Sequence, residues 1–399
     1  MFSLKLMMQK KLLILNGSHS EIPLIQAAKQ LGLKVITTGN APYLIGHNYA
    51  DEYHCADFSN KSEILSLSKK LDIHYICSSA NDFGAITASY VSEKMGLLGH
   101  DSYQTALTIH HKDQFKQFAL THDIPTPYAE SFCSIDDTIN AIDRYRFPLI
   151  IKPVDMTGGK GISKIEAPQE YEAAIHYAFS ISKAKRIVVE EFIQGTQHSF
   201  STFILKGKVV FYFSDNEYSY LNPYLVTTST APATNINKVA DKLVSTVEKI
   251  ASLLDLKDGV VHLQYLLQGD NAYIIEITRR CSGDLYPYPV SYATTLDWTQ
   301  WIVKAEMGLD CGDFPNVKQT GYCGRHCIMG SKNGVVKDII FSPKIQPHIY
   351  EQLMWWKQGD IIDNYLVQKL GLVFFHFSSV EEMQYKIECI NDHIKVIYQ

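Results

Sequence analysis

The chain has 399 residues, of which 46% are hydrophobic and 20% charged, a composition typical of folded globular proteins. A formal net charge of -5 excludes a broad basic surface, so we expect binding neither to nucleic acid nor to a membrane. The longest apolar runs are too short to span a bilayer, and residues 1–11 lack the cleavage site of an export signal. We therefore expect a cytoplasmic protein of two or three packed units.

The eight cysteines are scattered along the chain, which predicts reduced thiols rather than a disulfide framework. Cys323 and Cys327 flank Arg325 and His326, an arrangement that could suggest a metal site. Because no second pair of cysteines or histidines follows at the spacing of a zinc finger, we favour buried cysteines on a strand over a structural zinc site.

Apolar strands and amphipathic helices alternate over the first hundred residues. Strands are predicted at 11–17, 33–39 and 74–79, and helices at 20–32 and 61–72. Alternation at this spacing predicts a parallel sheet with right-handed crossovers. The turn NGSHSE after the first strand holds one glycine, so it lacks the GxGxxG fingerprint and disfavours a nicotinamide cofactor.

The middle of the chain changes from helix to strands. A helix is predicted at 103–122, and the proline-bent segment HDIPTPYAE cannot continue it. Strands dominate from Phe147, with one helix near 168–182 and another, with a clean 3.6-residue apolar stripe, at 238–256. A strand pair at 260–278 turns at QGDN, and a smaller unit of strands and helices follows residue 310.

The strand pair at 260–278 carries the sharpest chemical signal. With the turn centred near Asp270, Gln264 lies opposite Glu276 and His262 opposite Thr278, about 5 Å apart between Cβ atoms. Oxygen ligands at that separation can hold one or two magnesium ions. The alternative is that these polar side chains face solvent on an edge strand.

Two loops offer groups that suit anions. Arg280 followed by the turn Ser282-Gly283 presents a guanidinium and backbone N–H groups to a carboxylate, unless this is an ordinary surface loop. In IIKPVDMTGGKGI, Lys152 ends a strand and residues 157–161 supply backbone N–H groups for phosphate oxygens. This is not the GxxxxGK[ST] loop of P-loop proteins.

The strand end EEFIQG at 190–195 is the last signal. Its backbone could face a flat base and its carboxylate the polar edge of that base, although a solvated strand end is the simpler interpretation.

These separate signals follow one another along the chain from Lys112 to Arg280. In their order and spacing, the chain resembles the ATP-grasp superfamily between residue 11 and about residue 310. The hairpin is most similar to that of carbamoyl-phosphate synthase large subunits, whose metal-binding strands carry a Gln and then Glu-x-Asn-x-Arg. Here that pattern stands as Gln264 and Glu276-Ile277-Thr278-Arg279-Arg280.

The resemblance implies a mixed α/β and α+β ATP-grasp fold in which two subdomains clamp ATP. The implied division is an N-terminal parallel α/β domain at 1–105, an ATP-grasp domain at 106–310 with a lid at about 147–215, and a C-terminal α+β subdomain at 311–399. A homodimer is a common arrangement in similar proteins, and the sequence leaves the oligomeric state open.

The resemblance also implies a role for each matching residue. The expected nucleotide-binding residues are Lys112, Lys152, Thr157, Gly158, Gly159, Lys160, Gly161, Glu190, Glu191, Phe192, Ile193, Gln197 and His198. The expected ligands of Mg²⁺ or Mn²⁺ are Gln264, Glu276 and Thr278. Arg280, Lys152 and Glu276 would be catalytic, and the substrate would meet Arg280, Ser282, Gly283 and Arg325.

The implied activity is an ADP-forming ligase that joins a small carboxylic acid, such as an amino acid, to an amine through an acyl phosphate. A carboxylase that activates bicarbonate is an alternative, although the chain has no AMKM-like context for biotin. Gln197, Gln264 and Thr278 stand where similar proteins more often carry Glu, Glu and Asn. These departures motivate another alternative, a subunit that binds nucleotide with little turnover.

Overall fold

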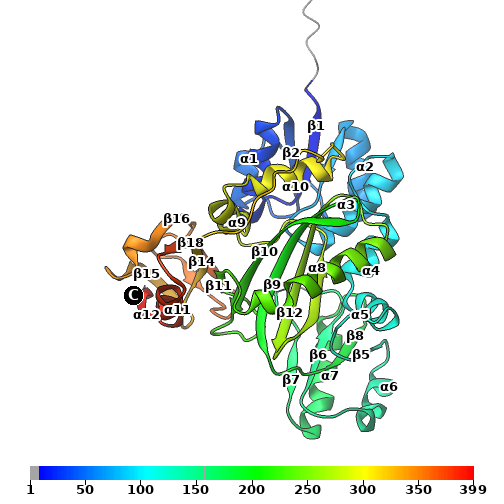
Figure 1. The fold of residues 1–399 in the computed structure, drawn as a ribbon, viewed down its shortest axis with the longest axis vertical. Helices are drawn as coiled ribbons and strands as arrows, with labels where there is room; N and C mark the ends of the chain where they lie inside the picture. Colours follow the sequence, from blue (N-terminus) through cyan, green and yellow to red (C-terminus); the bar gives the residue numbers. More distant parts are fainter. Residues whose placement is uncertain (1–8, 157) are drawn as a thin grey trace, which may run out of the picture.

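The computed structural model describes residues 9–156 and 158–399 (Figure 1). Its N-terminal part is a four-stranded parallel sheet in the order β3-β2-β1-β4, so the predicted parallel sheet is confirmed. Alternation along β1 buries Leu12 and Ile14 in one apolar cluster and Leu13 and Leu15 in another, because helices cover both faces. The elements are β1 (Lys11–Leu15), η1 (His19–Glu21), α1 (Ile22–Gln30), β2 (Lys34–Gly39), η2 (Ile45–Tyr49), β3 (Glu52–Cys55), α2 (Lys61–Leu71), β4 (Tyr75–Cys77) and α3 (Asp82–Met95).

The helix predicted at 103–122 is two helices, α4 (Tyr103–His110) and α5 (Lys112–Thr121). His111 between them is extended, with φ -97° and ψ 119°, and it ends one helix and begins the next. The break places Lys112 at the start of α5, where its backbone N–H donates to the carbonyl of Val154 at 3.3 Å. This irregularity therefore orients a residue of the predicted nucleotide site.

A second four-stranded sheet, in the order β5-β8-β6-β7, is antiparallel and lies below the central sheet in Figure 1. Helices α6 and α7 cover it, and Tyr171, Ile175 and Phe179 of α7 pack on Leu149 and Ile151 of β6. The elements are β5 (Ala129–Phe132), α6 (Ile135–Asn140), η3 (Ile142–Arg144), β6 (Leu149–Pro153), β7 (Ser163–Ile165), η4 (Pro168–Glu170), α7 (Tyr171–Ile181) and β8 (Ile187–Glu191).

An eight-stranded antiparallel sheet, in the order β13-β12-β9-β10-β11-β14-β18-β16, forms the centre of the molecule (Figure 1). Helix α8 covers one face, where Leu263 and Tyr265 of β12 are buried with Leu243 and Val247 of the helix. The strands and helices of this region are β9 (Thr196–Leu205), β10 (Lys208–Tyr218), β11 (Thr228–Ala231), α8 (Ile236–Leu253), β12 (Gly259–Gln268), β13 (Asn271–Thr278), α9 (Pro287–Thr294) and α10 (Trp298–Glu306).

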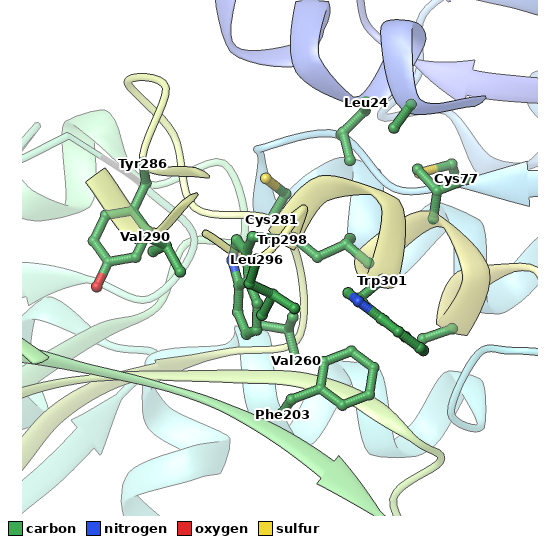
Figure 2. Packing of buried hydrophobic residues seen from close by; sticks show 14 of the residues in the cluster. Leu24, Cys77, Phe203, Val260, Cys281, Tyr286, Val290, Leu296, Trp298 and Trp301 are labelled. Carbon is green, nitrogen blue, oxygen red and sulfur yellow. The ribbon is translucent and has the colours of Figure 1, made fainter. Parts of the chain in front are cut away.

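The other face of the central sheet joins the N-terminal sheet through one apolar cluster (Figure 2). Trp298 and Trp301 of α10 pack on Phe203 of β9, with ring centroids 6.0 and 6.3 Å apart, and Leu24 of α1 belongs to the same cluster. Next to this apolar area the same sheet face becomes polar. That polar part of the face carries the predicted site residues Gln197 of β9, Gln264 of β12, and Glu276 and Thr278 of β13.

The C-terminal part extends the central sheet and adds a three-stranded sheet in the order β17-β15-β19. Its elements are β14 (Tyr322–Met329), β15 (Gly334–Phe341), η5 (Gln346–His348), β16 (Ile349–Met354), β17 (Ile361–Ile362), β18 (Lys369–Phe377), α11 (Val380–Glu388), α12 (Ile390–His393) and β19 (Ile394–Tyr398). Cys323 and Cys327 are buried on β14, as predicted. The division of the chain at residues 105 and 310 stays a prediction. Among the described residues, no helix is both long enough and apolar enough to cross a membrane.

Candidate active site

A cleft lies between the second four-stranded sheet and the polar part of the central sheet. Loops of the N-terminal part and strands of the C-terminal part complete its wall. The predicted site residues that line it are Lys112, Lys152, Gly158, Gly159, Glu190, Glu191, Phe192, Ile193, Gln197, Gln264, Glu276, Thr278, Arg280, Ser282, Gly283 and Arg325. The structure thus brings predicted residues as far apart in the sequence as Lys112 and Arg325 to one cavity.

The remaining predicted site residues lie elsewhere. His198 points to the opposite face of β9, because neighbouring side chains on a strand alternate, and it stacks on Tyr265 with ring centroids 5.2 Å apart. Burial lowers the pKa of His198 to about 4. Lys160 is exposed beside the cleft and Gly161 packs against Pro153, whereas Thr157 lies outside the described residues.

The hairpin of β12 and β13 has the predicted register, with Gln264 opposite Glu276 and His262 opposite Thr278. Lys112 Nζ lies 2.9 Å from Glu276 Oε1 and donates to the carbonyl of Met156 at 3.0 Å. Burial opposes the charge of Lys112, but Glu276 and Asp82 outweigh it and raise the pKa of the lysine. A cation suited to phosphate therefore already stands beside the principal acid of the predicted metal site.

A second ion cluster lies at the junction of β6, β8 and α5. Glu190 Oε2 is 2.9 Å from Lys152 Nζ and 3.1 Å from Lys116 Nζ, and all three side chains are buried. Burial lowers the pKa of Lys116 to about 8 although Glu190 opposes the change, and the two lysines hold the pKa of Glu190 below its usual value. Lysines engage Glu190, whereas among the described residues no Lys, Arg or His nitrogen lies within 4.0 Å of the carboxylate of the neighbouring Glu191. No sequence pattern identified Lys116, because it lies in the middle of an ordinary helix, α5.

Arg280 reaches the cleft with an acid partner from the N-terminal part. Its Nε lies 2.7 Å from Asp82 Oδ1, and the same oxygen is 3.1 Å from His110 Nδ1. Arg280 overcomes the effect of burial and holds the pKa of Asp82 far below its usual value. Asp82 begins α3, almost two hundred residues before its partner, so no local pattern could have revealed the pair.

A third cluster closes the far end of the cleft. Asp284 accepts from Lys369 Nζ at 2.7 and 2.6 Å, and its carboxylate lies 3.7 Å from both Arg325 Nη1 and His19 Nε2. The backbone N–H of Asp284 donates to Ser20 Oγ at 3.1 Å. One loop after β13 is thereby fastened to the N-terminal part, to β14 and to β18. Arg325 was predicted, whereas Asp284 and Lys369 were not.

Residues 145–287 match the ATP-grasp domain family. This chain contains an ATP-grasp domain. The match runs from just before β6 through the loop of Gly158 and Gly159 and the hairpin to the loop that holds Asp284, and so it includes most of the cleft wall. The recognition made from Lys152, the glycine loop and the hairpin is confirmed, as is the fold class.

Two curated relatives are similar to this chain over about two thirds of its length. The carbamoyl phosphate synthase large chain of Clostridium acetobutylicum is 21% identical over 65% of this chain, which spans only 24% of that protein. The formate-dependent phosphoribosylglycinamide formyltransferase of Rhodococcus jostii is 23% identical over 68% of each chain. This chain thus spans about a quarter of the length of the carbamoyl phosphate synthase that it matches.

Solved structures share the fold over nearly the whole chain. An L-amino acid ligase from Bacillus licheniformis has a TM-score of 0.82 at 19% identity, covering 98% of this chain and 99% of that one. A phosphoribosylglycinamide synthetase from Anaerococcus prevotii has a TM-score of 0.76 at 22% identity, covering 98% and 100%. A 2-oxoglutarate carboxylase domain from Hydrogenobacter thermophilus, solved with MgADP and bicarbonate, has a TM-score of 0.75 at 16% identity, covering 97% and 90%.

The residues of the hairpin suit a magnesium ion whose other ligands are phosphate oxygens and water. In the described part of the chain, no three His, Cys, Asp or Glu side chains are grouped to hold a metal. The donors present are the carboxylate of Glu276, the amide of Gln264 and the hydroxyl of Thr278, which is buried and lacks a hydrogen-bond partner. Mg²⁺ accepts one or two carboxylates and completes its shell with water and phosphate, so this small donor set fits it.

Proposed function

We propose that this chain is an ADP-forming, ATP-dependent ligase that joins a small carboxylic acid to an amine. The observation that carries the proposal is that one cleft is lined by groups suited to each reactant. Phe192 and Ile193 offer an apolar surface, Lys112, Lys152 and Glu276 offer charges for phosphate and metal, and Arg280 and Arg325 offer cations for an acid. The solved structures named as a synthetase and an amino acid ligase, which share the fold of this chain, support it.

Each group has a task in that reaction. Lys112 and Lys152 would bind phosphate oxygens, and Arg280 would hold the acid substrate beside the γ-phosphate. A divalent ion bound by Glu276, Gln264 and Thr278 would neutralise the charge that develops on the phosphates. A carboxylate oxygen then attacks the γ-phosphorus while the bond to ADP breaks. In the second step, the amine nitrogen attacks the acyl carbon, phosphate leaves, and the nitrogen loses its proton.

The ion pairs of the cleft keep these cations in place before substrates arrive. Lys112 is held by Glu276, and Arg280 is held by Asp82. Fixed charges that need no rearrangement stabilise a transition state more than mobile ones do. The backbone of Gly158 and Gly159 lines the cleft beside them, where a closed loop would keep water away from an acyl phosphate.

The far end of the cleft carries charges of both signs. Arg280, Arg325 and Lys369 are cationic, and Asp82 and Asp284 are anionic. An amino acid can share both halves of these ion pairs, because its carboxylate suits the cations and its ammonium group suits the acids. We therefore propose an amino acid as the acid substrate. A cytoplasmic location and a homodimer stay predictions.

The test measures ADP release with pooled amino acids and small amines, with bicarbonate as a separate acid. Hydroxylamine added to the same mixture traps an acyl phosphate as a hydroxamate. We expect both signals from the wild type, and Glu276→Ala should lower them by about 100-fold. Tight ATP binding without turnover on any acid would favour a binding subunit, and turnover only with bicarbonate would favour a carboxylase.

A further inference from the structure

Glu217, near the end of β10, is an acid of the cleft wall that no sequence signal identified. Gln264 Nε2 donates to its two carboxylate oxygens at 2.9 and 2.8 Å. Gln197 Nε2 donates to Oε2 of the same carboxylate at 2.9 Å. Both donors are neutral amides. Among the described residues, no Lys, Arg or His nitrogen lies within 4.0 Å of this carboxylate.

A half-buried carboxylate without a cation is costly, so its place in the cleft needs a reason. Asp215, a second acid, lies two residues earlier on β10, and Arg325 pairs with Asp284 rather than with Glu217. The cavity beside Glu217 is therefore electrically suited to receive a positive charge.

The hydrogen bonds of Glu217 also fix the orientation of Gln264. An ionised carboxylate only accepts hydrogen bonds, so the NH₂ group of each amide must face it. The amide oxygen of Gln264 is then the atom left for another partner. Gln264 stands opposite Glu276 in the strand register, so this oxygen belongs to the same wall as the carboxylate of Glu276.

The charge of the proposed metal site links the unpaired carboxylate of Glu217 to the orientation of Gln264. The proposed metal ligands include one carboxylate, that of Glu276, and Lys112 lies 2.9 Å from it. Gln264 provides an oxygen but no charge. Glu217 lies one hydrogen bond behind Gln264 and restores the missing negative charge to the site. Partners in that position orient a ligand and raise its donor strength.

We propose that Glu217 is the positioning residue of the metal site, where it turns the amide oxygen of Gln264 toward the divalent ion and supplies the charge that Gln264 lacks. This inference rests on the proposed function, because it presumes that a metal–nucleotide complex binds at the hairpin. It also explains how a chain with glutamine at both 197 and 264 retains two negative charges beside the phosphate position.

The test exchanges the acid and the amide. Glu217→Gln removes the charge and leaves Gln264 without a fixed orientation. The double variant Glu217→Gln/Gln264→Glu puts the acid at 264 and the amide at 217, so the same pair can form with its polarity reversed. Binding of Mn²⁺ with ADP is measured by electron paramagnetic resonance of the bound ion and by calorimetry of ADP with and without Mn²⁺. Glu351→Gln, an exposed acid on β16 of the same sheet, is the control.

We expect Glu217→Gln to weaken Mn²⁺ binding by about 10-fold or more, a size typical of lost partners of metal ligands. ADP binding without metal should not weaken, because the variant only removes a negative charge beside the phosphates, and the double variant should recover most of the Mn²⁺ affinity. Wild-type Mn²⁺ affinity in Glu217→Gln, or no recovery in the double variant, would overturn the inference. If the wild type binds no nucleotide at all, the proposed function fails instead.

Discussion

Neighbouring residues on one strand end have separate tasks in this protein. Arg280 turns to Asp82 and the cleft, whereas Arg279 turns away and pairs with Asp101 at 2.8 Å. The same alternation puts Gln197 in the cleft and His198 against Tyr265. The alternation of side chains along a strand predicts which face of the sheet each residue lies on, but it does not predict which residues it contacts there.

His326 shows how a buried side chain gives the molecule a measurable pH dependence. It lies on β14, 4% exposed, with Nδ1 2.7 Å from Thr228 Oγ1. Burial, and secondarily Arg325, lowers its pKa from 6.5 to about 3. Below pH 6.5 the unfolded chain binds a proton that the folded chain does not, so the free energy of unfolding falls as the pH falls toward 3.

His326→Gln should remove this contribution and keep a polar partner for Thr228. On going from about pH 7 to about pH 5.5, the unfolding free energy of the variant should gain about 1 kcal/mol relative to wild type. Chemical denaturation of both proteins at both pH values measures the change. Comparing the two proteins cancels the similar effect of His262 and the opposite effect of Glu217, whose pKa is raised. A difference that does not vary with pH would contradict the argument.

At the scale of elements, the loop between β6 and β7 depends on two glycines that differ in their surroundings. Gly158 and Gly159 both have positive φ, 67° and 74°. A Cβ atom on Gly159 would lie 2.6 Å from the carbonyl oxygen of Tyr224, whereas one on Gly158 would meet nothing within 4 Å. The hydroxyl of Tyr224 also accepts from the backbone N–H of Lys164 at 2.7 Å. Tyr224 thus contacts both the loop, at Gly159, and strand β7, at Lys164.

Gly158→Ala and Gly159→Ala separate backbone strain from this close contact. Both variants incur the left-handed strain, about 1 kcal/mol, but only Gly159→Ala must move the loop away from Tyr224. We expect Gly159→Ala to weaken ADP binding by about 10-fold more than Gly158→Ala, or about 1.4 kcal/mol. Calorimetry gives the affinities, and hydrogen exchange of residues 158–164 reports the displacement. Equal affinities in the two variants would show that the contact with Tyr224 does not hold the loop.

The sequence predicted those parts of the elements whose cause is local. Apolar alternation and the turn QGDN predicted the hairpin, including the register of Gln264 and Glu276. The break at His111 was not predicted, because both halves of 103–122 have helical patterns and the break depends on contacts with Val154. Asp82, Asp284, Lys369 and Glu217 were missed for a related reason. Each acts through a partner far away in the chain, and no short-range pattern encodes such a pair.

At the scale of the whole molecule, the N-terminal part and the central sheet are joined by an apolar cluster and a buried ion pair. Arg279 pairs with Asp101 through Nε at 2.8 Å and Nη2 at 3.3 Å, and Nη2 also donates to the carbonyl of Lys257 at 2.7 Å. Asp101 accepts in turn from the backbone N–H of Lys257. Burial opposes the charge of Asp101, but Arg279 keeps its pKa below the usual value. The acid is therefore charged and depends on the arginine.

Arg279→Met should destabilise the protein by about 3 kcal/mol or more, because it leaves Asp101 charged and unpaired in a dry environment. The double variant Arg279→Met/Asp101→Asn should recover a large part of that loss, since the uncompensated charge is then gone. Lys208→Met is the control, because Lys208 pairs with Glu248 at the surface, where an ion pair contributes less than about 1 kcal/mol. Denaturant titration measures all four proteins. A loss in Arg279→Met no larger than that in Lys208→Met would mean that the apolar cluster around Trp298 alone joins the two parts.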